Sequence, residues 1–369
     1  MVRQLRDTQL IIDLQKIKKN IEVVKEIIGP DVAFMPVIKA NGYGHGAVGI
    51  APAIMETNPA YLAVATLSEA VELKEAHPTY PVFIMGHTPD QYLPYVVEYD
   101  IAMTVFTLHQ VQLLGQLAKD AGKTIKVHVK VDTGFHRLGK MPSPEYADEI
   151  CAMFAVENVE IEGIFSHLAL TNEEENDKQY NMFCKFIEEL QTRGYDFKYK
   201  HIADSIATVD YPQYHMNMVR PGAIIYGMKR NEAATVPVDA AITFKTAISQ
   251  LHHIKAGEGV SYDYLWKAEK DSVVATLPFG YADGYPRNLR DKGYVIINGT
   301  KCPIVGVICM DQCIADVTEV SHVEEGMEAI IYGDGQDGSM TIAEAASLAG
   351  TNKNEIIARF LARPQRIFV

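Results

Sequence analysis

A lysine stands at the end of the first strongly apolar run of the chain and precedes a glycine-rich turn. Residues 33–38 are apolar, Lys39 ends the run, and glycines occupy positions 42, 44 and 46. Burial of an ammonium group is unfavourable and lowers its pKa, so such a lysine can act as a base, a nucleophile or a Schiff-base amine. The simpler interpretation is a lysine whose amine reaches solvent at the strand end. The glycines favour chemistry, because they permit tight turns and close approach of the backbone to a ligand.

Further polar residues fall where later apolar runs end. They are Lys130, Asp132, Arg137, His167, His201, Asp204, Ser205, Arg220 and Gly222. Ser205 at a helix start, with the amides of Gly222 and Ala223, can hold a phosphate. A lysine facing a phosphate site predicts pyridoxal 5′-phosphate bound as a Schiff base. Each residue alone also fits an ion pair, a core histidine or a helix cap, so the hypothesis depends on their convergence.

The elements that would position these residues are short strands alternating with helices. The expected strands span residues 33–39, 61–66, 82–86, 101–105, 126–132, 161–167, 198–203 and 218–226. This alternation is typical of parallel strands joined by crossovers, and eight strands predict a closed (β/α)8 barrel whose site lies at the strands' C-terminal ends. An open doubly wound sheet is the alternative, and it is disfavoured because no GxGxxG follows the first strand.

The pattern changes after about residue 238, where strands and turns replace the alternating units. The expected elements are strands at 241–249, 272–278, 294–297, 301–308, 313–316 and 329–333, and helices at 342–349 and from 354. We therefore predict an α/β protein with a barrel over residues 10–238 and a mostly β domain over residues 239–369.

Composition narrows the class of partner. The chain has 369 residues, 48% of them hydrophobic, and a net charge of −13, which argues against binding to nucleic acid or to an anionic membrane. The five cysteines form no CxxC pair, so we expect a reduced, cytoplasmic setting and no metal site. No apolar stretch is long enough to span a bilayer, although the sequence could be the cytoplasmic segment of a longer membrane protein.

Several blocks of the sequence together resemble the alanine racemase family. They are the residues 37–46, 129–134, 137–139, 163–167, 219–222, 260–262, 280–285 and 309–312. The resemblance runs the length of the chain. It implies a pyridoxal phosphate enzyme with a barrel followed by a β domain, residues 1–9 joining the β domain, and a homodimer with shared active sites.

The resemblance also implies the catalytic groups. Lys39 matches the lysine that binds the cofactor and serves as one base, while Tyr262, supplied by the partner subunit, matches the base on the opposite face. Racemisation requires both, because one group removes the Cα proton and the other returns it. From the residues alone, Tyr262 would be an ordinary strand tyrosine with its hydroxyl at the surface.

Cofactor contacts follow in the same way. The matched phosphate ligands are Tyr43, Ser205, Gly222 and Ala223. Arg220 matches the arginine that faces the ring nitrogen, and His167 would support it. Arg137 matches the arginine near the cofactor's phenolic oxygen and the substrate carboxylate. Lys130 matches a lysine that is often carbamylated in the family, where the new anion would position Arg137.

Substrate contacts include one marked departure from the family pattern. Met310 matches a residue whose amide meets the substrate carboxylate, and Asp311 and Tyr281 match groups of the entry corridor. Asn354 stands where a tyrosine is usual, a residue that narrows the substrate pocket and touches the phosphate. A smaller, polar residue there should admit the hydroxyl of serine. The sequence thereby resembles the alanine/serine racemases of vancomycin-resistance type, which carry an added membrane domain.

Our hypothesis is a racemase of serine and alanine that supplies D-amino acids for peptidoglycan precursors. An ordinary alanine racemase is the first alternative. A non-catalytic pyridoxal phosphate barrel and a decarboxylase of related fold are the others. The former should lack the β domain and the Tyr262 block. Asp204, Asp263 and the pair Phe135-His136 also depart from the family pattern, through either drift or specificity.

Overall fold

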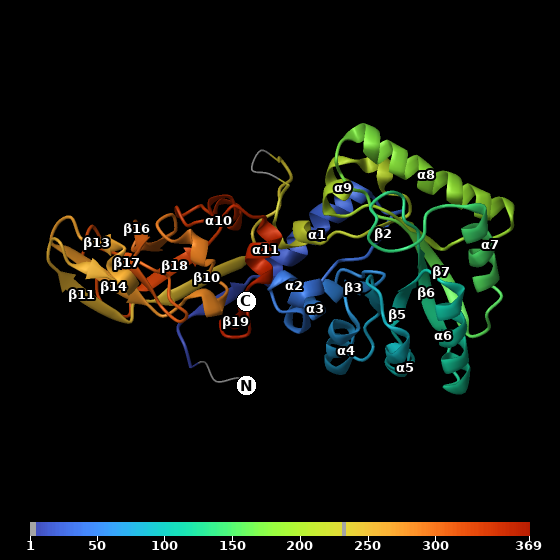
Figure 1. Ribbon diagram of the computed structural model, residues 1–369, viewed down its shortest axis with the longest axis horizontal. Helices are drawn as coiled ribbons and strands as arrows, with labels where there is room; N and C mark the ends of the chain where they lie inside the picture. The colour runs from blue at the N-terminus through green and yellow to red at the C-terminus, as the bar shows by residue number, and fades with distance from the viewer. Residues whose placement is uncertain (1–4, 231–233) are drawn as a thin grey trace. The chain divides into compact units, whose positions relative to one another are not determined.

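The structure, a computed structural model, describes residues 5–230 and 234–369. The chain divides into two compact units (Figure 1). The barrel unit comprises Lys18–Gly42 and Ala51–Ile225, and the β-rich unit comprises the described residues of Met1–Ile17, Tyr43–Ile50 and Tyr226–Val369. The predicted boundaries at residues 10 and 238 differ from these edges. Residues 1–4 and 231–233 of the predicted domains lie outside the described residues.

Within the described residues, the barrel unit contains eight parallel strands in the order β2-β9-β8-β7-β6-β5-β4-β3. They are β2 (Ala33–Phe34), β3 (Leu62–Val64), β4 (Val82–Ile84), β5 (Ala102–Val105), β6 (Ile125–Lys130), β7 (Val159–Phe165), β8 (Tyr199–His201) and β9 (Met218–Val219). The two ends of the sheet meet where Val37 bridges Ala63 and the amide of Ile38 donates to the Ala63 carbonyl at 2.8 Å. The predicted α/β barrel is confirmed.

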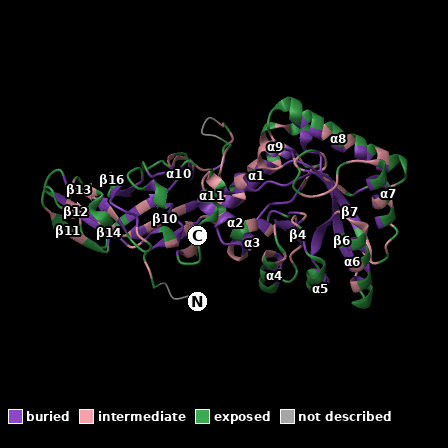
Figure 2. Cartoon of the chain, viewed as in Figure 1, coloured by how far each residue is buried: buried purple, intermediate pink, exposed green. Residues whose placement is uncertain are grey.

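Helices follow most of these strands and turn their polar faces outward. They are α4 (Leu67–Ala76), α5 (Leu93–Glu98), α6 (Leu108–Asp120), α7 (Pro144–Met153), α8 (Glu173–Thr192) and α9 (Ser205–Asp210), while α1 (Leu14–Ile28), α2 (Lys39–Tyr43) and α3 (Ala47–Met55) cross the unit boundaries. Figure 2 shows buried strands and exposed outer helix faces. Burial on both sheet sides explains why the strands read as continuous apolar runs.

The β-rich unit is built on a sheet of nine strands, counted over the residues the structure describes, in the order β11-β14-β17-β16-β15-β18-β10-β1-β19. They are β1 (Gln9–Ile12), β10 (Ile242–Ala247), β11 (Gln250–Ile254), β14 (Ser272–Leu277), β15 (Tyr294–Ile297), β16 (Thr300–Val305), β17 (Cys313–Asp316), β18 (Glu328–Tyr332) and β19 (Gln365–Phe368). β12 (Gly259–Val260) and β13 (Trp266–Lys267) form a separate hairpin, and α10 (Ile342–Ala349) and α11 (Lys353–Ala358) complete the unit.

Strand β1 corrects the predicted start of the barrel at residue 10. It pairs antiparallel with β10 and parallel with β19, so residues 10–12 belong to the sheet of the β-rich unit. Their carbonyl and amide groups are satisfied there, which gives the chain's first strand a place outside the barrel.

The glycines that follow Tyr43 pack against protein backbone in the β-rich unit. A Cβ at Gly44 would lie 2.2 Å from the carbonyl oxygen of Ile357 in α11, and one at Gly49 would lie 2.0 Å from the Phe368 ring. The Arg366 Nε donates to the Gly44 carbonyl at 2.8 Å. The sequence predicts that the glycines at 42, 44 and 46 allow close approach of a ligand, and of these Gly44 and Gly46 lie against α11 and β19 respectively. They allow the segment 43–50 to dock closely on α11 and β19.

Candidate active site

Lys39 begins a left-handed turn at the C-terminal side of the first barrel strand. Ala40, Asn41 and Gly42 have φ values of 52°, 53° and 62°. The turn is held on its outer side, where the Ala40 amide donates to the Glu69 carboxylate at 2.6 Å. A non-glycine residue in this region costs about 1–2 kcal/mol, and such strain is found at functional sites. The sequence indicated a turn at the glycines but gave no sign that Ala40 and Asn41 would share it.

The Lys39 amine lies in a partly buried, cationic environment. Burial is the main cause that lowers its pKa, and the charge of Arg137 lowers it further, while Glu69 and Asp204 oppose the shift. A lowered pKa makes the unprotonated amine more accessible, and a base or a covalent amine requires that form.

Arg220 directly follows β9 and is 4% exposed. Its Nη1 donates to His201 Nδ1 at 2.7 Å, and its Nη2 donates to the carbonyls of Ser166 and Ile202 at 2.9 and 3.1 Å. Burial lowers its pKa to about 10. Within residues 5–230 and 234–369, its hydrogen bonds go to imidazoles and carbonyls and none goes to a carboxylate. A buried arginine that is hydrogen-bonded to no carboxylate is unusual, because buried charges are normally paired, and here the charge of Asp204 acts only from a distance.

His167 also contacts Arg220, as the resemblance implied. The Arg220 Nη2 lies 3.3 Å from His167 Nδ1, and the His167 ring packs edge-on to Phe135 at 5.0 Å between centroids. Burial and the Arg220 charge lower the pKa of His167 to about 2, so this imidazole is neutral and its Nδ1 can accept from Arg220.

Ser205 opens α9 and lies against the loop after β9. Its Oγ accepts from the Gly222 amide at 2.8 Å and from the Ile224 amide at 3.4 Å, and Ala223 lies between these two residues. Asp204 is the N-cap of α9 and accepts from two amides of its first turn. Because asparagine caps helices equally well, the departure at Asp204 has a local structural explanation.

Lys130 and Asp132 organise the loop after β6. Burial is the main cause that lowers the pKa of Lys130 to about 7, and the Arg220 charge adds to it. The Lys130 Nζ donates to the carbonyl of Val131. Asp132 Oδ1 accepts from the amides of residues 134–136 at 2.9–3.1 Å, which shapes the loop that carries Arg137. Arg137 is exposed, and its guanidinium stacks 4.4 Å from the Phe135 ring.

These groups in the barrel unit fit pyridoxal phosphate. The serine hydroxyl and the amides around it suit a phosphate, and the amine of lowered pKa suits an aldehyde. A donor-only guanidinium suits an unprotonated ring nitrogen. The chemical types of these side chains fit the cofactor. They lie in one unit and are Lys39, Lys130, Arg137, His167, Ser205 and Arg220.

Tyr262 belongs to the β-rich unit, at the tip of the hairpin formed by β12 and β13. Its side chain is 68% exposed, and Tyr264 beside it is 64% exposed. Asp263, which stands where glycine is usual, has a φ of 60°. Aspartate tolerates this left-handed region better than most residues, so the turn keeps its shape without glycine.

Tyr281 and Met310 are joined through their backbones. The Tyr281 amide donates to the Cys309 carbonyl at 3.1 Å, and the Ala282 amide donates to the Met310 carbonyl at 3.0 Å. The side chains of Tyr281 and Met310 are 39% and 52% exposed. Both residues are therefore partly exposed on two segments of the β-rich unit that are hydrogen-bonded to each other.

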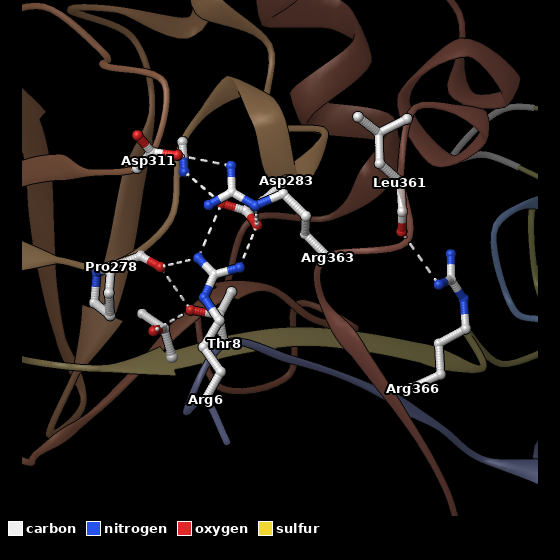
Figure 3. Close-up of polar contacts among 10 residues, drawn as sticks. Arg6, Thr8, Pro278, Asp283, Asp311, Leu361, Arg363 and Arg366 are labelled. Atoms are coloured by element: carbon white, nitrogen blue, oxygen red, sulfur yellow. Dashed lines mark hydrogen bonds and ion pairs between the residues drawn. The ribbon is translucent and has the colours of Figure 1, made fainter. Parts of the chain in front are cut away.

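An ion-pair cluster that the sequence did not reveal lies at the turn that carries Tyr281 (Figure 3). Arg6 donates to both oxygens of the buried Asp283 at 2.5 and 3.1 Å. Arg363 lies 3.7 Å from the same carboxylate and donates to Asp311 at 2.7 Å. Asp311, predicted only as a corridor residue, is thus linked to the turn that carries Tyr281. Residues spaced so far apart in sequence offer no local pattern that would have found the cluster.

Asn354 and Tyr43 lie in the β-rich unit as well. Asn354 is exposed at the start of α11, whose N-cap is Asn352. Tyr43 is buried, with its ring 5.2 Å from that of Tyr226. Their predicted contacts with the phosphate therefore stay predictions.

Among the described residues, no group of histidine, cysteine and carboxylate side chains has the arrangement of a metal site. Over the same ranges, the structure contains no helix with both the length and the apolar character of a membrane span.

The fold and the site define a class, a barrel with a reactive lysine joined to a β-rich domain. Comparison with known families matches residues 12–230 to the alanine racemase N-terminal domain and residues 241–368 to the alanine racemase C-terminal domain. The chain belongs to the alanine racemase family. Its relatives make it an amino-acid racemase, an isomerase.

Three known proteins illustrate the likeness. An alanine racemase of Clostridium tetani is 36% identical over 377 residues, covering 100% of this chain and 97% of its own. The structure of an alanine racemase of Clostridium difficile superimposes with a TM-score of 0.95 at 31% identity, over 100% and 97% of the two chains. One of Bartonella henselae, described with covalently bound pyridoxal phosphate, has a TM-score of 0.86 at 27% identity over 98% and 99%.

Proposed function

We propose that this chain is a pyridoxal phosphate-dependent alanine racemase that works through two bases, Lys39 and the partner subunit's Tyr262. The observation that carries the proposal is the buried guanidinium of Arg220, close to a lysine of lowered pKa and bonded to imidazoles and carbonyls. The barrel unit would hold the cofactor, and the β-rich domain of a partner copy would complete the site.

Within the chain, Lys39 would bind the cofactor covalently, and Ser205, Gly222, Ala223 and Tyr43 would hold its phosphate. When bound, the cofactor stabilises the negative charge left on the substrate's Cα after the proton departs. Arg220 would donate to the ring nitrogen, and His167 and His201 hold its guanidinium in position.

Arg220 would restrict the outcome of the reaction because a guanidinium can donate a hydrogen bond to the ring nitrogen but cannot accept one from it, and so does not favour a protonated ring. Without a carboxylate at that position, the charge on Cα is less strongly stabilised. The proton then returns quickly, and racemisation is favoured over slower side reactions.

The two bases are supported by opposite properties. Burial lowers the pKa of the Lys39 amine, so its unprotonated form is more accessible than that of an ordinary lysine, and this form would take a proton and return it. Tyr262 is 68% exposed on its hairpin, and a catalytic phenol needs a surface to complete its environment. A homodimer with shared sites would provide that surface.

We also propose that Lys130 carries a carbamate. With a pKa of about 7, roughly half of its amines are unprotonated at neutral pH, and only the unprotonated amine reacts with carbon dioxide. The resulting anion would balance Arg220 and hold Arg137 toward the substrate carboxylate.

Alanine is the substrate that the named relatives favour. Asn354 is the feature that favours serine as a second substrate, because an exposed asparagine leaves more room than a tyrosine and can bond to a hydroxyl. It also supports a likeness to the alanine/serine racemases of vancomycin-resistance type. In either case the product would be a D-amino acid suited to peptidoglycan precursors.

The test is to incubate the cofactor-loaded protein with L-alanine and L-serine separately and to follow the D-enantiomers. Absence of D-alanine would overturn the proposed function. D-serine formed within about 100-fold of the D-alanine rate would support the second substrate, since a hydroxyl is discriminated by about that factor in an apolar pocket.

Two variants separate the contributions of Asn354. In Asn354→Tyr we expect serine turnover to fall with alanine turnover kept, and an equal loss of both would assign the residue to the cofactor. Asn354→Ala keeps the space but removes the amide. Retained serine turnover there would mean that space alone admits serine.

A further inference from the structure

A line of polar side chains runs from Arg220 into the barrel interior. His201 Nδ1 accepts from Arg220 at 2.7 Å, and His201 Nε2 lies 2.8 Å from His128 Nδ1. His128 Nε2 faces Glu162 Oε2 at 3.6 Å, and the side chains of these two residues are 0% and 1% exposed. Neither His128 nor Glu162 was predicted as a site residue.

The direction of this line is fixed by chemistry. Arginine can only donate, so His201 Nδ1 must accept and the single proton of a neutral His201 must lie on Nε2. That proton is donated to His128 Nδ1, which leaves the proton of His128 on Nε2, toward Glu162. Burial lowers the pKa of both imidazoles, so both are neutral.

The far end of the line is anchored by charge. Glu162 accepts from Lys198 at 2.9 Å and from Lys126 at 3.3 Å, and the hydroxyl of Tyr61 donates to it. Burial opposes ionisation, but these partners and His128 keep the pKa of Glu162 below its usual range. A cavity of about 350 Å³ lies at this end and is lined by Tyr61, Lys126, Glu162 and Lys198, among others.

Aromatic rings pack beside both imidazoles. The Phe83 ring lies 4.5 Å from that of His128, and the Phe165 ring stacks on that of His201 at 4.8 Å with an interplanar angle of 8°. Neither ring supplies a hydrogen bond, so the direction in which the imidazoles donate is set by their polar partners.

We propose that His128 and Glu162 are positioning residues for the racemisation, which stabilise the Nε2-protonated tautomer of His201 that Arg220 requires and thereby hold the orientation of the Arg220 guanidinium. The inference rests on the proposed function, in which Arg220 faces the cofactor ring. A His201 with its proton on Nδ1 would point an N–H at an arginine N–H. The negative charge of Glu162, 3.6 Å from His128 Nε2, disfavours that arrangement because it attracts the His128 proton to Nε2 and leaves Nδ1 free to accept from His201.

This indirect link from Glu162 to Arg220 matters because Arg220 has imidazole and carbonyl partners where buried cations usually have carboxylates. Polarised hydrogen bonds strengthen one another in a low-dielectric interior, so a distant carboxylate can stabilise the arginine through two neutral rings. Outer partners of this kind are typically worth about 10–100-fold in activity.

The first test is nitrogen NMR of the histidine side chains in the cofactor-loaded protein. We expect His128 and His201 both to be neutral with the proton on Nε2. An imidazolium at either position, or a proton on Nδ1 of either ring, would overturn the proposal. This measurement does not depend on turnover, so it stands even if the proposed racemase activity fails.

The second test uses variants in kinetic and spectroscopic assays. In His128→Leu we expect kcat to fall about 10–100-fold, KM to change by less than about threefold, and the visible absorbance of the bound cofactor to shift. His128→Asn places an amide oxygen near the lost Nδ1 and should recover most of kcat. Glu162→Gln removes the charge and should reproduce the shift if His128→Leu does not fold.

Phe83→Leu is the matched control. It disturbs packing on the His128 ring and removes no hydrogen bond. We therefore expect kcat to stay within about threefold of the unsubstituted value and the cofactor absorbance not to shift. An equal fall in kcat for Phe83→Leu and His128→Leu would mean that packing alone acts, and the proposal would be wrong.

Discussion

The two units present their site residues in opposite ways. In the barrel unit, Arg220 is 4% exposed and held by several hydrogen bonds before any ligand arrives. In the β-rich unit, Tyr262 and Met310 are 68% and 52% exposed on well-braced backbones. Buried groups gain strength from a fixed, water-poor setting. The exposed groups of the β-rich unit lack such a setting. The comparison indicates that the barrel unit holds its site residues in place by itself, whereas those of the β-rich unit need a further protein surface to bury them.

Lys39→Ala should cause the largest loss of activity among the substitutions in the barrel unit. We expect racemisation to fall by more than the roughly 10⁴-fold that a single acid–base group contributes at most, because covalent cofactor binding is lost too. Absorbance of the bound cofactor and D-alanine formation check this. Lys74 is a matched control, since burial also lowers its pKa. Lys74→Ala should keep activity, and visible absorbance typical of the covalent cofactor in Lys39→Ala would contradict the assignment.

Tyr262→Phe should disable the exposed half without disturbing the buried one. Racemisation should fall about 10²–10⁴-fold, while cofactor binding and the unfolding temperature stay unchanged, because Tyr262 is 68% exposed on its own subunit and the variant keeps the ring. Tyr264→Phe removes a similar hydroxyl from the same turn and should be silent. Equal losses in the two variants would show that the turn, and not a base, is being disturbed.

Gly44→Ala tests how much the close packing of Gly44 on α11 contributes to the stability of the β-rich unit. The new methyl group would overlap the Ile357 carbonyl at a φ of 77°. We expect the free energy of unfolding to fall by about 1–3 kcal/mol from overpacking. Gly350 has a φ of 69° with nothing within 4 Å, so Gly350→Ala measures the backbone contribution, about 1 kcal/mol. If urea denaturation gives the same loss of unfolding free energy for Gly44→Ala and Gly350→Ala, steric overlap with the Ile357 carbonyl is not the cause.

The buried half should also leave a smaller signature in pH. Lys130 has a pKa of about 7 when folded, against 10.5 ordinarily, so between these values the unfolded chain binds a proton that the folded chain lacks. Stability should therefore rise with pH across this window, by at most about 1.4 kcal/mol per unit from this group. In carbonate-free buffer, the slope should be lower in Lys130→Met than in the unsubstituted protein. Parallel slopes would refute the shift.

The barrel and the positions of its strand-end residues could be predicted because buried parallel strands appear as continuous apolar runs. The strand β11 was missed, since it is largely exposed and carries no such run. The left-handed turn at Ala40 and Asn41 was missed because their types do not demand it. His128 was within reach: Lys126, His128 and Lys130 alternate along β6, which places them on one face. Glu162 and the cluster of Arg6, Asp283 and Arg363 could not be found, because only the fold brings their partners together.

The central claim is that each site joins the lysine of one subunit to the tyrosine of another. Co-expression of Lys39→Ala and Tyr262→Phe chains with different tags tests it directly. In a shared-site dimer, each mixed pair contains one site with both lesions and one with neither. Random pairing should restore about one quarter of unsubstituted activity, and purified mixed dimers about half. Mixed dimers no more active than either parent variant would contradict the account.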